Sequence, residues 1–279
     1  YRNVILEPDD MVLVISQSGE TADTLAALRL AKEKGCIAIA LCNVVGSSIP
    51  READAVLYTQ AGPEISVAST KAMCSQMVIM ALIALYYGQR KGLLDAKTRH
   101  EALAALHGLP KQIEDALPAM RETARRLSPL YASASSFFYL GRGHAFPLAL
   151  EGALKLKEIS YIHSEAYTAG ELKHGPISLI EDGTLVIAIC TYDKLFDKMM
   201  SNVKEVKARG AVVLGITTQQ KKEAVSQEAD YSFCVPKISD FMLPSLSIIP
   251  LQLFAYYVAS MKGCDIDKPR NLAKSVTVE

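Results

Sequence analysis

The chain has 279 residues, half of them hydrophobic, which is enough apolar material for one large or two ordinary domains. Its 30 basic and 30 acidic residues cancel, so there is no electrostatic reason to expect nucleic acid or an anionic membrane as a partner. The first residues lack the charged segment and the cleavage site of a signal peptide, and we therefore expect a cytoplasmic protein.

The first part of the chain alternates predicted strands and helices. The expected elements, in chain order, are a strand over 10–16, a helix over 22–34, a strand over 36–42, a short strand over 55–59 and a helix over 69–88. The last helix contains the longest apolar run, residues 77–87. That run is too short to span a bilayer and is typical of a core helix.

The segment from residue 93 to residue 132 is charged, alanine-rich and helical in pattern. We predict a helical connector with breaks at Pro110, Pro118 and Pro129, because proline inside a helix removes a backbone donor and clashes with the preceding turn.

The rest of the chain repeats the first pattern. Its expected strands cover 136–141, 182–189, 211–217 and 231–235. One expected helix covers 147–162, a second follows the strand over 182–189 and ends at residue 209, and a third covers 243–262. Gly35 and Gly210 precede corresponding strands, and the pairs Ala53-Asp54 and Ala229-Asp230 recur at nearly equal spacing. Such a repeat indicates a duplicated architecture.

We therefore predict an α/β protein with two tandem doubly wound parallel-sheet subdomains. The expected parts are a first subdomain over 1–92, the connector over 93–132, a second subdomain over 133–264 and an ordered tail over 265–279. The strand over 136–141 and its helix have no counterpart in the first half. By symmetry we expect the first subdomain to be truncated at its N-terminus by about 40 residues, one strand and one helix.

Cysteine and histidine show no ligand spacing. The six cysteines form no C-x-x-C pair and most lie in apolar runs, as is typical of buried thiols in a reducing compartment. The five histidines form no metal-binding pattern. We expect no disulfide framework, no metal and no cofactor.

Three hydroxyl residues follow the apolar run of the first predicted strand, residues 11–15, in the sequence Ser16-Gln17-Ser18-Gly19-Glu20-Thr21. The start of a helix has unpaired N–H groups and a positive dipole end, so this turn suits a phosphate. Ser18 is equally a good N-cap for a helix with no ligand. No phosphate-binding loop of the nucleotide-binding type is present, which favours a small phosphorylated metabolite.

Two further segments could carry chemistry. Glu151, Lys155 and Glu158 are spaced to share one helix face, either as a solvated ion-pair row or with Glu158 as a general base. His174 lies between Gly170 and Gly175-Pro176 and is expected to be displayed, either structurally or for proton transfer.

The C-terminal tail is richer in apolar residues after Lys274 than a typical disordered end. Tail lysines are usually solvated. An ordered tail could instead bury Lys274, lower its pKa and free its amine to attack a carbonyl.

Six segments together resemble the sugar-isomerase (SIS) half of the glucosamine-6-phosphate synthases, also called glutamine–fructose-6-phosphate aminotransferases. These segments are Ser16–Thr24, Val67–Lys71, Leu140–Gly143, Leu154–Tyr161, Gly170–Pro176 and Pro269–Glu279. The resemblance covers essentially the whole chain, and it implies two SIS-type subdomains.

The resemblance also implies site residues. The phosphate of fructose 6-phosphate would be held by Ser16, Gln17, Ser18 and Thr21, while Val67 and Ala273 would line the sugar site. Lys274 would form a Schiff base with the C2 ketone, and Glu158 would move a proton between C1 and C2. Lys155 would lie near the reacting hydroxyls. His174 would assist ring opening from the neighbouring subunit of a homodimer.

In that family a glutaminase domain of the same full-length chain delivers ammonia, and no such domain is within this sequence. The full enzyme would make glucosamine 6-phosphate for hexosamine biosynthesis, whereas this fragment is expected at most to isomerise fructose 6-phosphate or to use free ammonia. Three alternatives remain open: a non-catalytic sugar-phosphate sensor, an aldose–ketose isomerase acting through Glu158 alone, and a structural repeat with no ligand.

Overall fold

A computed structural model describes residues 4–275 of the chain. The fold divides into two compact units. The first unit consists of residues 1–84 together with 270–279, and the second of residues 85–269. The predicted tail over 265–279 is thus shared between the units, and its residues 276–279 lie outside the described residues, as do residues 1–3.

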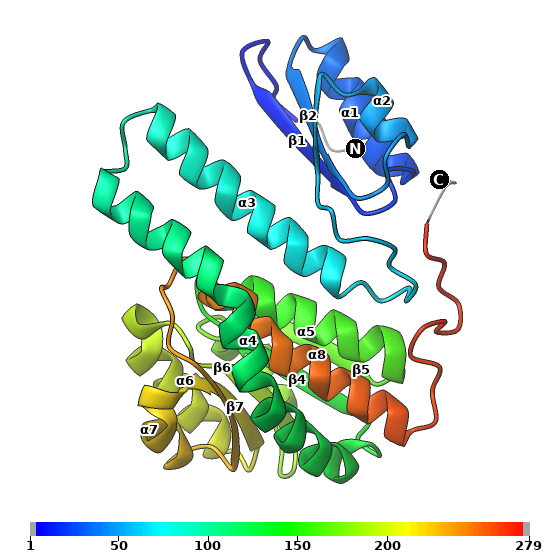
Figure 1. Cartoon of the computed structure of the whole chain (residues 1–279). Coiled ribbons are helices and arrows are strands. Elements are labelled where there is room, and N and C mark those ends of the chain that lie inside the picture. The colour runs from blue at the N-terminus through cyan, green and yellow to red at the C-terminus, as the bar shows by residue number, and fades with distance from the viewer. Residues whose placement is uncertain (1–3, 276–279) are drawn as a thin grey trace. The chain divides into compact units, whose positions relative to one another are not determined.

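The first unit contains a three-stranded parallel sheet in the order β1-β2-β3 (Figure 1). Its elements are β1 (Met11–Ser16), α1 (Ala22–Glu33), β2 (Ile37–Cys42), α2 (Ser48–Glu52), β3 (Ala55–Tyr58) and the first part of α3 (Lys71–Arg90). One face of the sheet packs on Leu28 of α1 and Ile49 of α2, both fully buried. Apolar side chains on the other face, Met11, Ile15 and Ile37, are exposed.

The second unit contains a five-stranded parallel sheet in the order β5-β4-β6-β7-β8. Its strands are β4 (Ser136–Gly141), β5 (His163–Thr168), β6 (Leu185–Ile189), β7 (Val212–Thr218) and β8 (Tyr231–Val235). Its helices are α4 (Ala96–Tyr131), α5 (Ala145–Ser160), α6 (Phe196–Lys207), α7 (Lys222–Ser226) and α8 (Leu243–Met261). Four short 3₁₀ segments complete it: η1 (Leu172–His174), η2 (Pro176–Leu179), η3 (Asp193–Leu195) and η4 (Gln219–Lys221).

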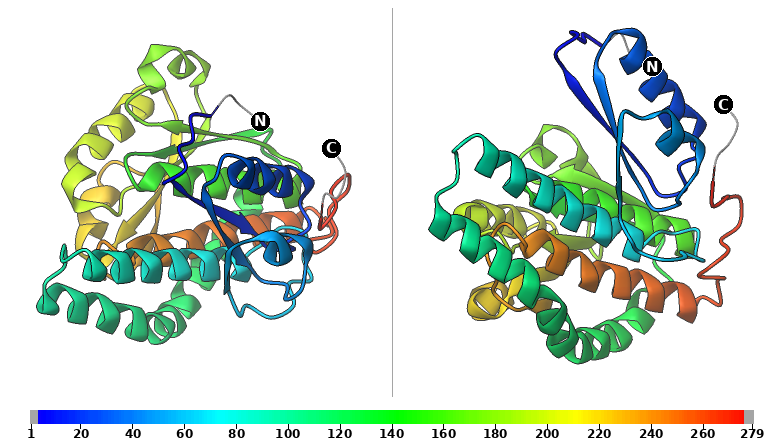
Figure 2. Two further views of the ribbon diagram at one scale, coloured as in Figure 1. Left: turned by 90° about the horizontal axis from the view of Figure 1, so that it is seen from above. Right: turned by 45° about the horizontal axis from the view of Figure 1, so that its top comes forward.

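Helices cover both faces of this second sheet, as strand-helix alternation requires (Figure 2). On one face, Phe254 of α8 makes edge contacts with Phe137 and Tyr131. On the other face, Phe138 packs with Met199 and Val203 of α6. The predicted fold class, an α/β protein with tandem parallel sheets, is confirmed. The domain boundaries given above stay predictions.

The predicted repeat appears as a matched set of contacts. Asp54 accepts a hydrogen bond from the Ala38 N–H at 2.8 Å and from Lys32 Nζ at 2.9 Å. Asp230 likewise accepts from the Val213 N–H at 2.7 Å and from Lys207 Nζ at 2.8 Å. Each aspartate directly precedes its own strand and is therefore tied to the neighbouring strand and to the helix that leads into that neighbouring strand.

The predicted breaks in the connector are wrong. Helix α4 runs without interruption through Pro110, Pro118 and Pro129, and it curves along its length (Figure 1). A proline costs a helix one hydrogen bond and bends it, but 36 residues with a buried face can absorb that cost.

Two helices, α3 and α8, are long and apolar enough to cross a membrane by length and composition alone. Helix α8 is mostly buried, as the core helix of a globular domain is.

Candidate active site

The turn between β1 and α1 is held by its first serine. Ser16 ends β1 and is buried, and its hydroxyl accepts the Gly19 N–H at 2.9 Å and lies 3.3 Å from the Thr21 hydroxyl. Gly19 adopts a φ of +69°, and a Cβ there would lie 2.0 Å from Ser47 Oγ. Only glycine fits both the backbone angle and the space.

The turn is also fixed from the side by the start of α2. The Gly19 carbonyl accepts the Ile49 N–H at 2.9 Å, and Glu20 Oε1 accepts the Ser48 N–H at 2.9 Å. The hydrogen bonds from Ser48 lower the pKa of Glu20 below its usual range. The turn is therefore rigid before any ligand arrives, which is the condition for a selective anion site.

The other predicted binding residues of this turn, Gln17, Ser18 and Thr21, are half-buried. The Gln17 carbonyl accepts the Asn43 N–H at 3.3 Å. Ser18 Oγ accepts the Glu20 N–H at 3.2 Å and lies 3.2 Å from Ser275 Oγ of the tail. Ser18 thus joins the turn to the C-terminal segment.

The tail brings Lys274 into the same unit as the serine turn. Its Nζ donates to the Ser66 carbonyl at 2.5 Å, and the side chain is half-buried. Val67, next to Ser66, is half-buried, whereas Ala273 is exposed. Residues 66 and 274, far apart in sequence, are therefore in direct contact.

Glu64 organises the segment that meets Lys274. Its carboxylate accepts the Ala72 N–H at 2.8 Å and the Ser69 hydroxyl at 3.0 Å, which satisfies donors at the start of α3. Burial acts to raise the pKa of Glu64, but these hydrogen bonds, that of Thr70 and the positive charge of Lys274 together lower it. Glu64 therefore supplies a negative charge close to Lys274.

The predicted row on α5 exists in the second unit. Lys155 is buried, with its Nζ 2.8 Å from Glu158 Oε2 and 3.5 Å from Glu151 Oε1. The side chains of Glu151 and Glu158 are only 16% and 20% exposed, so this is not a solvated surface row. Burial raises the pKa of Glu151, and the nearby charge of Glu158 adds to that effect, against the lowering influence of Lys155.

His174 ends the 3₁₀ segment η1 and is displayed, as the two flanking breaks predicted. Its side chain is 66% exposed, and its Nε2 lies 3.9 Å from Glu171 Oε2. Gly175 follows it with a φ of +153°. An exposed imidazole of this kind can meet a ligand or another protein surface.

The predicted site residues thus fall into two sets. The first unit holds Ser16, Gln17, Ser18, Thr21, Val67, Ala273 and Lys274, and the tail contacts both the turn, through Ser18, and the segment at Ser66. The second unit holds Lys155, Glu158 and His174, with Lys155 and Glu158 in contact.

Sequence reasoning missed Glu64, Ser66 and Ser275 as partners of these residues. Glu64 left no recognisable sequence signal, because it lies well before Lys71, the first residue of α3, and outside the positions that capping patterns cover. The contacts of Ser66 and Ser275 join segments about 200 residues apart or more and leave no local signal.

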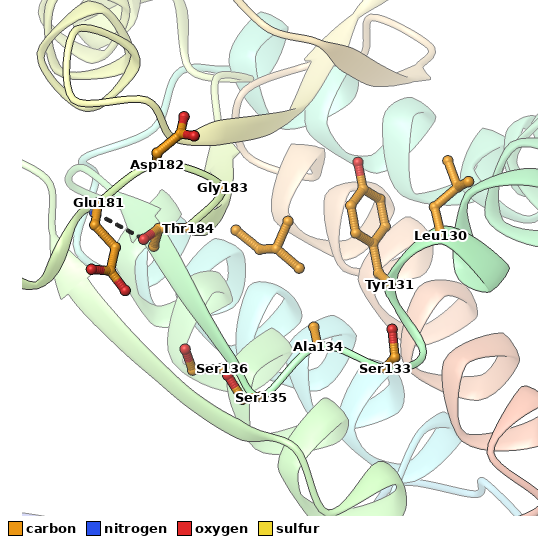
Figure 3. Close-up of a pocket in the computed structure, with 11 residues that line it drawn as sticks. Leu130, Tyr131, Ser133, Ala134, Ser135, Ser136, Glu181, Asp182, Gly183 and Thr184 are labelled. Atoms are coloured by element: carbon orange, nitrogen blue, oxygen red, sulfur yellow. Dashed lines mark hydrogen bonds between the residues drawn. The ribbon is translucent and has the colours of Figure 1, made fainter.

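A hollow of about 340 Å³ in the second unit is lined by Glu181, Asp182 and several serines (Figure 3). It lies at the amino ends of β4 and β6, next to Ser136 and Leu185. Parallel sheets bind ligands at the carboxyl ends of their strands, so this hollow is not part of the candidate active site. Within residues 4–275 no group of three or more His, Cys, Asp or Glu could hold a metal.

Comparison with known proteins finds a family model that matches most of the chain. The model of the SIS domain matches residues 4–86 and 130–262. The chain is 54% identical over its whole length to glutamine–fructose-6-phosphate aminotransferase [isomerizing] of Clostridium tetani and covers 46% of that protein. The C-terminal domain of glucosamine-fructose-6-phosphate aminotransferase from Francisella tularensis is similar in structure, with a TM-score of 0.91 and 40% identity over 96% of this chain and 76% of that one.

A more distant neighbour, glucosamine-6-phosphate deaminase from Thermotoga maritima, has a TM-score of 0.74 at 24% identity over 98% of this chain and 77% of that one. At that identity the likeness shows the fold alone. The chain spans about half the length of the curated relatives that it matches.

Proposed function

Because this chain belongs to the SIS domain family and matches the SIS half of aminotransferases about twice its length, we propose that it is the isomerase part of a glutamine–fructose-6-phosphate aminotransferase. It would bind fructose 6-phosphate, form a Schiff base and convert ketose to aldose. The product is glucosamine 6-phosphate, with ammonia from a glutaminase domain in the same full-length protein.

One observation supports this proposal above the others: the tail that carries Lys274 lies against the hydroxyl turn, through Ser275 and Ser18. A phosphate at the start of α1 would meet backbone N–H groups, the dipole of a 12-residue helix and the hydroxyls of Ser18 and Thr21. A sugar anchored there extends toward the tail. A primary amine and an anion site in one unit are what a Schiff-base step on a sugar phosphate needs.

The chemistry divides among the residues as follows. The Lys274 amine attacks the C2 carbonyl of the open sugar, and loss of water gives an iminium. Ammonia then adds to C2 and displaces the Lys274 amine, which leaves an iminium whose nitrogen comes from ammonia. The iminium withdraws electrons and acidifies the proton on C1. The Glu158 carboxylate accepts that proton and returns it to C2, which completes the shift from ketose to aldose. Lys155, bonded to Glu158 at 2.8 Å, orients the carboxylate and can reach a substrate hydroxyl.

The assignment of Lys274 and Glu158 to the same substrate molecule is part of this proposal. The cytoplasmic location and the homodimer are part of it as well. His174 would act in sugar-ring opening, on the substrate of the neighbouring subunit. Its high exposure agrees with a role outside its own unit.

Reductive trapping tests the proposal directly. The chain is incubated with fructose 6-phosphate and sodium borohydride, which reduces an iminium to a stable secondary amine, and the modified lysine is located by peptide mass spectrometry. We expect one hexitol phosphate adduct at Lys274. The matched control is Lys268→Arg, in the same tail, which should keep the adduct, whereas Lys274→Arg should lose it.

Absence of any adduct would rule out the Schiff base, and an adduct that survives Lys274→Arg would rule out its assignment to Lys274. The sensor alternative predicts binding with no adduct. The simple isomerase predicts isomerisation in Lys274→Ala near the rate of the unsubstituted chain.

A further inference from the structure

A polar hollow of about 470 Å³ lies in the second unit along the outer edge of its sheet. Its walls come from α4, from the edge strand β8 and from the segment of η4 and α7. The volume is within the range of roughly 300–1,000 Å³ that small-molecule sites occupy. Strand β5, which leads to His174, is at the opposite edge of the same sheet.

Two cations from different elements line this hollow. Arg126 comes from α4 and Lys222 from the start of α7, and both are exposed. In the described part of the chain neither has a carboxylate within 4.0 Å of its charged group. The Cys234 thiol lines the same hollow; burial raises its pKa, and the positive charge of Lys222 acts in the opposite direction.

The other polar lining is neutral or already neutralised. Thr123, Ser232 and Gln219 bring hydroxyls and an amide. Asp230 also lines the hollow, but its carboxylate is taken up by Lys207 Nζ at 2.8 Å and by the Val213 N–H at 2.7 Å. The charge left over in the hollow is therefore positive.

We propose that this hollow binds a small phosphorylated metabolite, with the phosphate between Arg126 and Lys222 and the polar body against Thr123 and Ser232. A guanidinium offers a planar fork of donors that matches phosphate oxygens, and an ammonium adds a point charge. A dianion would balance the two cations. The hollow of Figure 3 has the opposite character, since it is lined by Glu181 and Asp182 and by no cation.

Calorimetric titration of the 279-residue chain tests this site. A Ser18→Ala background weakens the proposed site of the first unit, and the heat that the test variant removes is assigned to the hollow of the second unit. Three probes separate the sources of phosphate: adenosine monophosphate, ribose 5-phosphate and inorganic phosphate. The test variant is Arg126→Gln with Lys222→Gln. The matched control, Arg125→Gln with Lys198→Gln, removes two exposed cations of the same unit that do not line the hollow.

We expect one of the two organic phosphates to bind more tightly than inorganic phosphate. Its dissociation constant should rise at least tenfold in the test variant and less than twofold in the control. Exchange of the cations, Arg126→Lys with Lys222→Arg, should keep part of the affinity. The proposal is overturned if neither organic phosphate binds at millimolar concentration, if inorganic phosphate binds as tightly, or if test and control variants behave alike.

Discussion

Ser16 and Ser18, the two serines of the turn after β1, have different structural roles. Ser16 is buried and holds the Gly19 N–H, so it maintains the shape of the turn. Ser18 is half-buried, and within the described residues its hydroxyl meets the Glu20 N–H and the tail hydroxyl of Ser275. Ser18 is therefore the hydroxyl better placed for a ligand, although sequence alone gave the two serines equal standing.

Replacement of Ser18 should weaken substrate binding without loss of the fold. We expect Ser18→Ala to weaken fructose 6-phosphate binding by about 1–2 kcal/mol, the scale of one hydrogen bond to a charged group. Calorimetry measures it. Ser16→Ala is the contrasting variant, because the unpaired Gly19 N–H should lower the free energy of unfolding. An unchanged dissociation constant in Ser18→Ala would remove this serine from the phosphate site.

Glu158 is a carboxylate held by a buried lysine, as a base that must keep one position requires. We expect Glu158→Gln to abolish exchange of the C1 proton of fructose 6-phosphate with solvent deuterium, while binding persists. Proton NMR follows the exchange. The control is Glu122→Gln, at an exposed carboxylate on α4, which should exchange normally. Exchange retained in Glu158→Gln would refute the assignment.

Glu151 gives a pH dependence of stability. Its pKa is raised on folding, chiefly by burial, so the folded state binds its proton more tightly than the unfolded state does. The stabilisation is complete below the unfolded pKa of about 4.3 and is lost as pH rises through the raised folded value. The Glu151→Gln variant has no carboxyl group to ionise at this position, so its free energy of unfolding should not fall in this way as pH rises. Urea unfolding at several pH values measures the difference, and parallel curves for both proteins would contradict it.

At the scale of elements, both subdomains have the same hydrogen-bonded aspartate at the edge of the sheet. Asp54 and Asp230 each bind a backbone N–H of the neighbouring strand and a lysine of the helix that leads into that strand, α1 or α6. The residues before β3 and β8 are therefore fixed in register by a side chain as well as by the strand ladder. This explains why the Ala-Asp pair recurs in the sequence.

Loss of the Asp230 hydrogen bonds should destabilise the second unit. Asp230→Ala leaves the Val213 N–H without its acceptor and Lys207 without its partner, and we expect a loss of about 1–3 kcal/mol in the free energy of unfolding. Urea denaturation measures it, with Asp197→Ala on α6 as the exposed control. Equal stability of the two variants would show that the strand ladder alone sets the register.

For the whole molecule, the exposure of His174 leads to a prediction about subunits. Chains with His174→Ala and chains with Lys274→Arg should each be inactive. Mixed after unfolding and refolding, they should regain up to about a quarter of the original activity, because half of random dimers are mixed and each mixed dimer has one intact site. An isomerisation assay measures the recovery. No recovery, with dimers shown to mix, would place His174 in the site of its own chain.

The sequence by itself determined the parallel α/β class, the duplication and most of the elements. Buried parallel strands are continuous apolar runs, and the glycines and Ala-Asp pairs mark their ends, so these signals are local. The strand β5 was missed because its residues, His163-Ser164-Glu165-Ala166-Tyr167-Thr168, are mostly polar, as an edge strand permits. The continuity of α4 was missed because packing outweighed the local cost of three prolines.

Only the tertiary structure decided which residues are partners. The sequence marked Lys274 and the serine turn separately, but their link through Ser66, Ser18 and Ser275 needs the tail to return to the first unit. The burial of Lys155 and the positive charge of the hollow at Arg126 and Lys222 are equally set by elements distant in the chain. Periodicity and capping act over a few residues, whereas a site is made where the fold brings remote segments within hydrogen-bond reach.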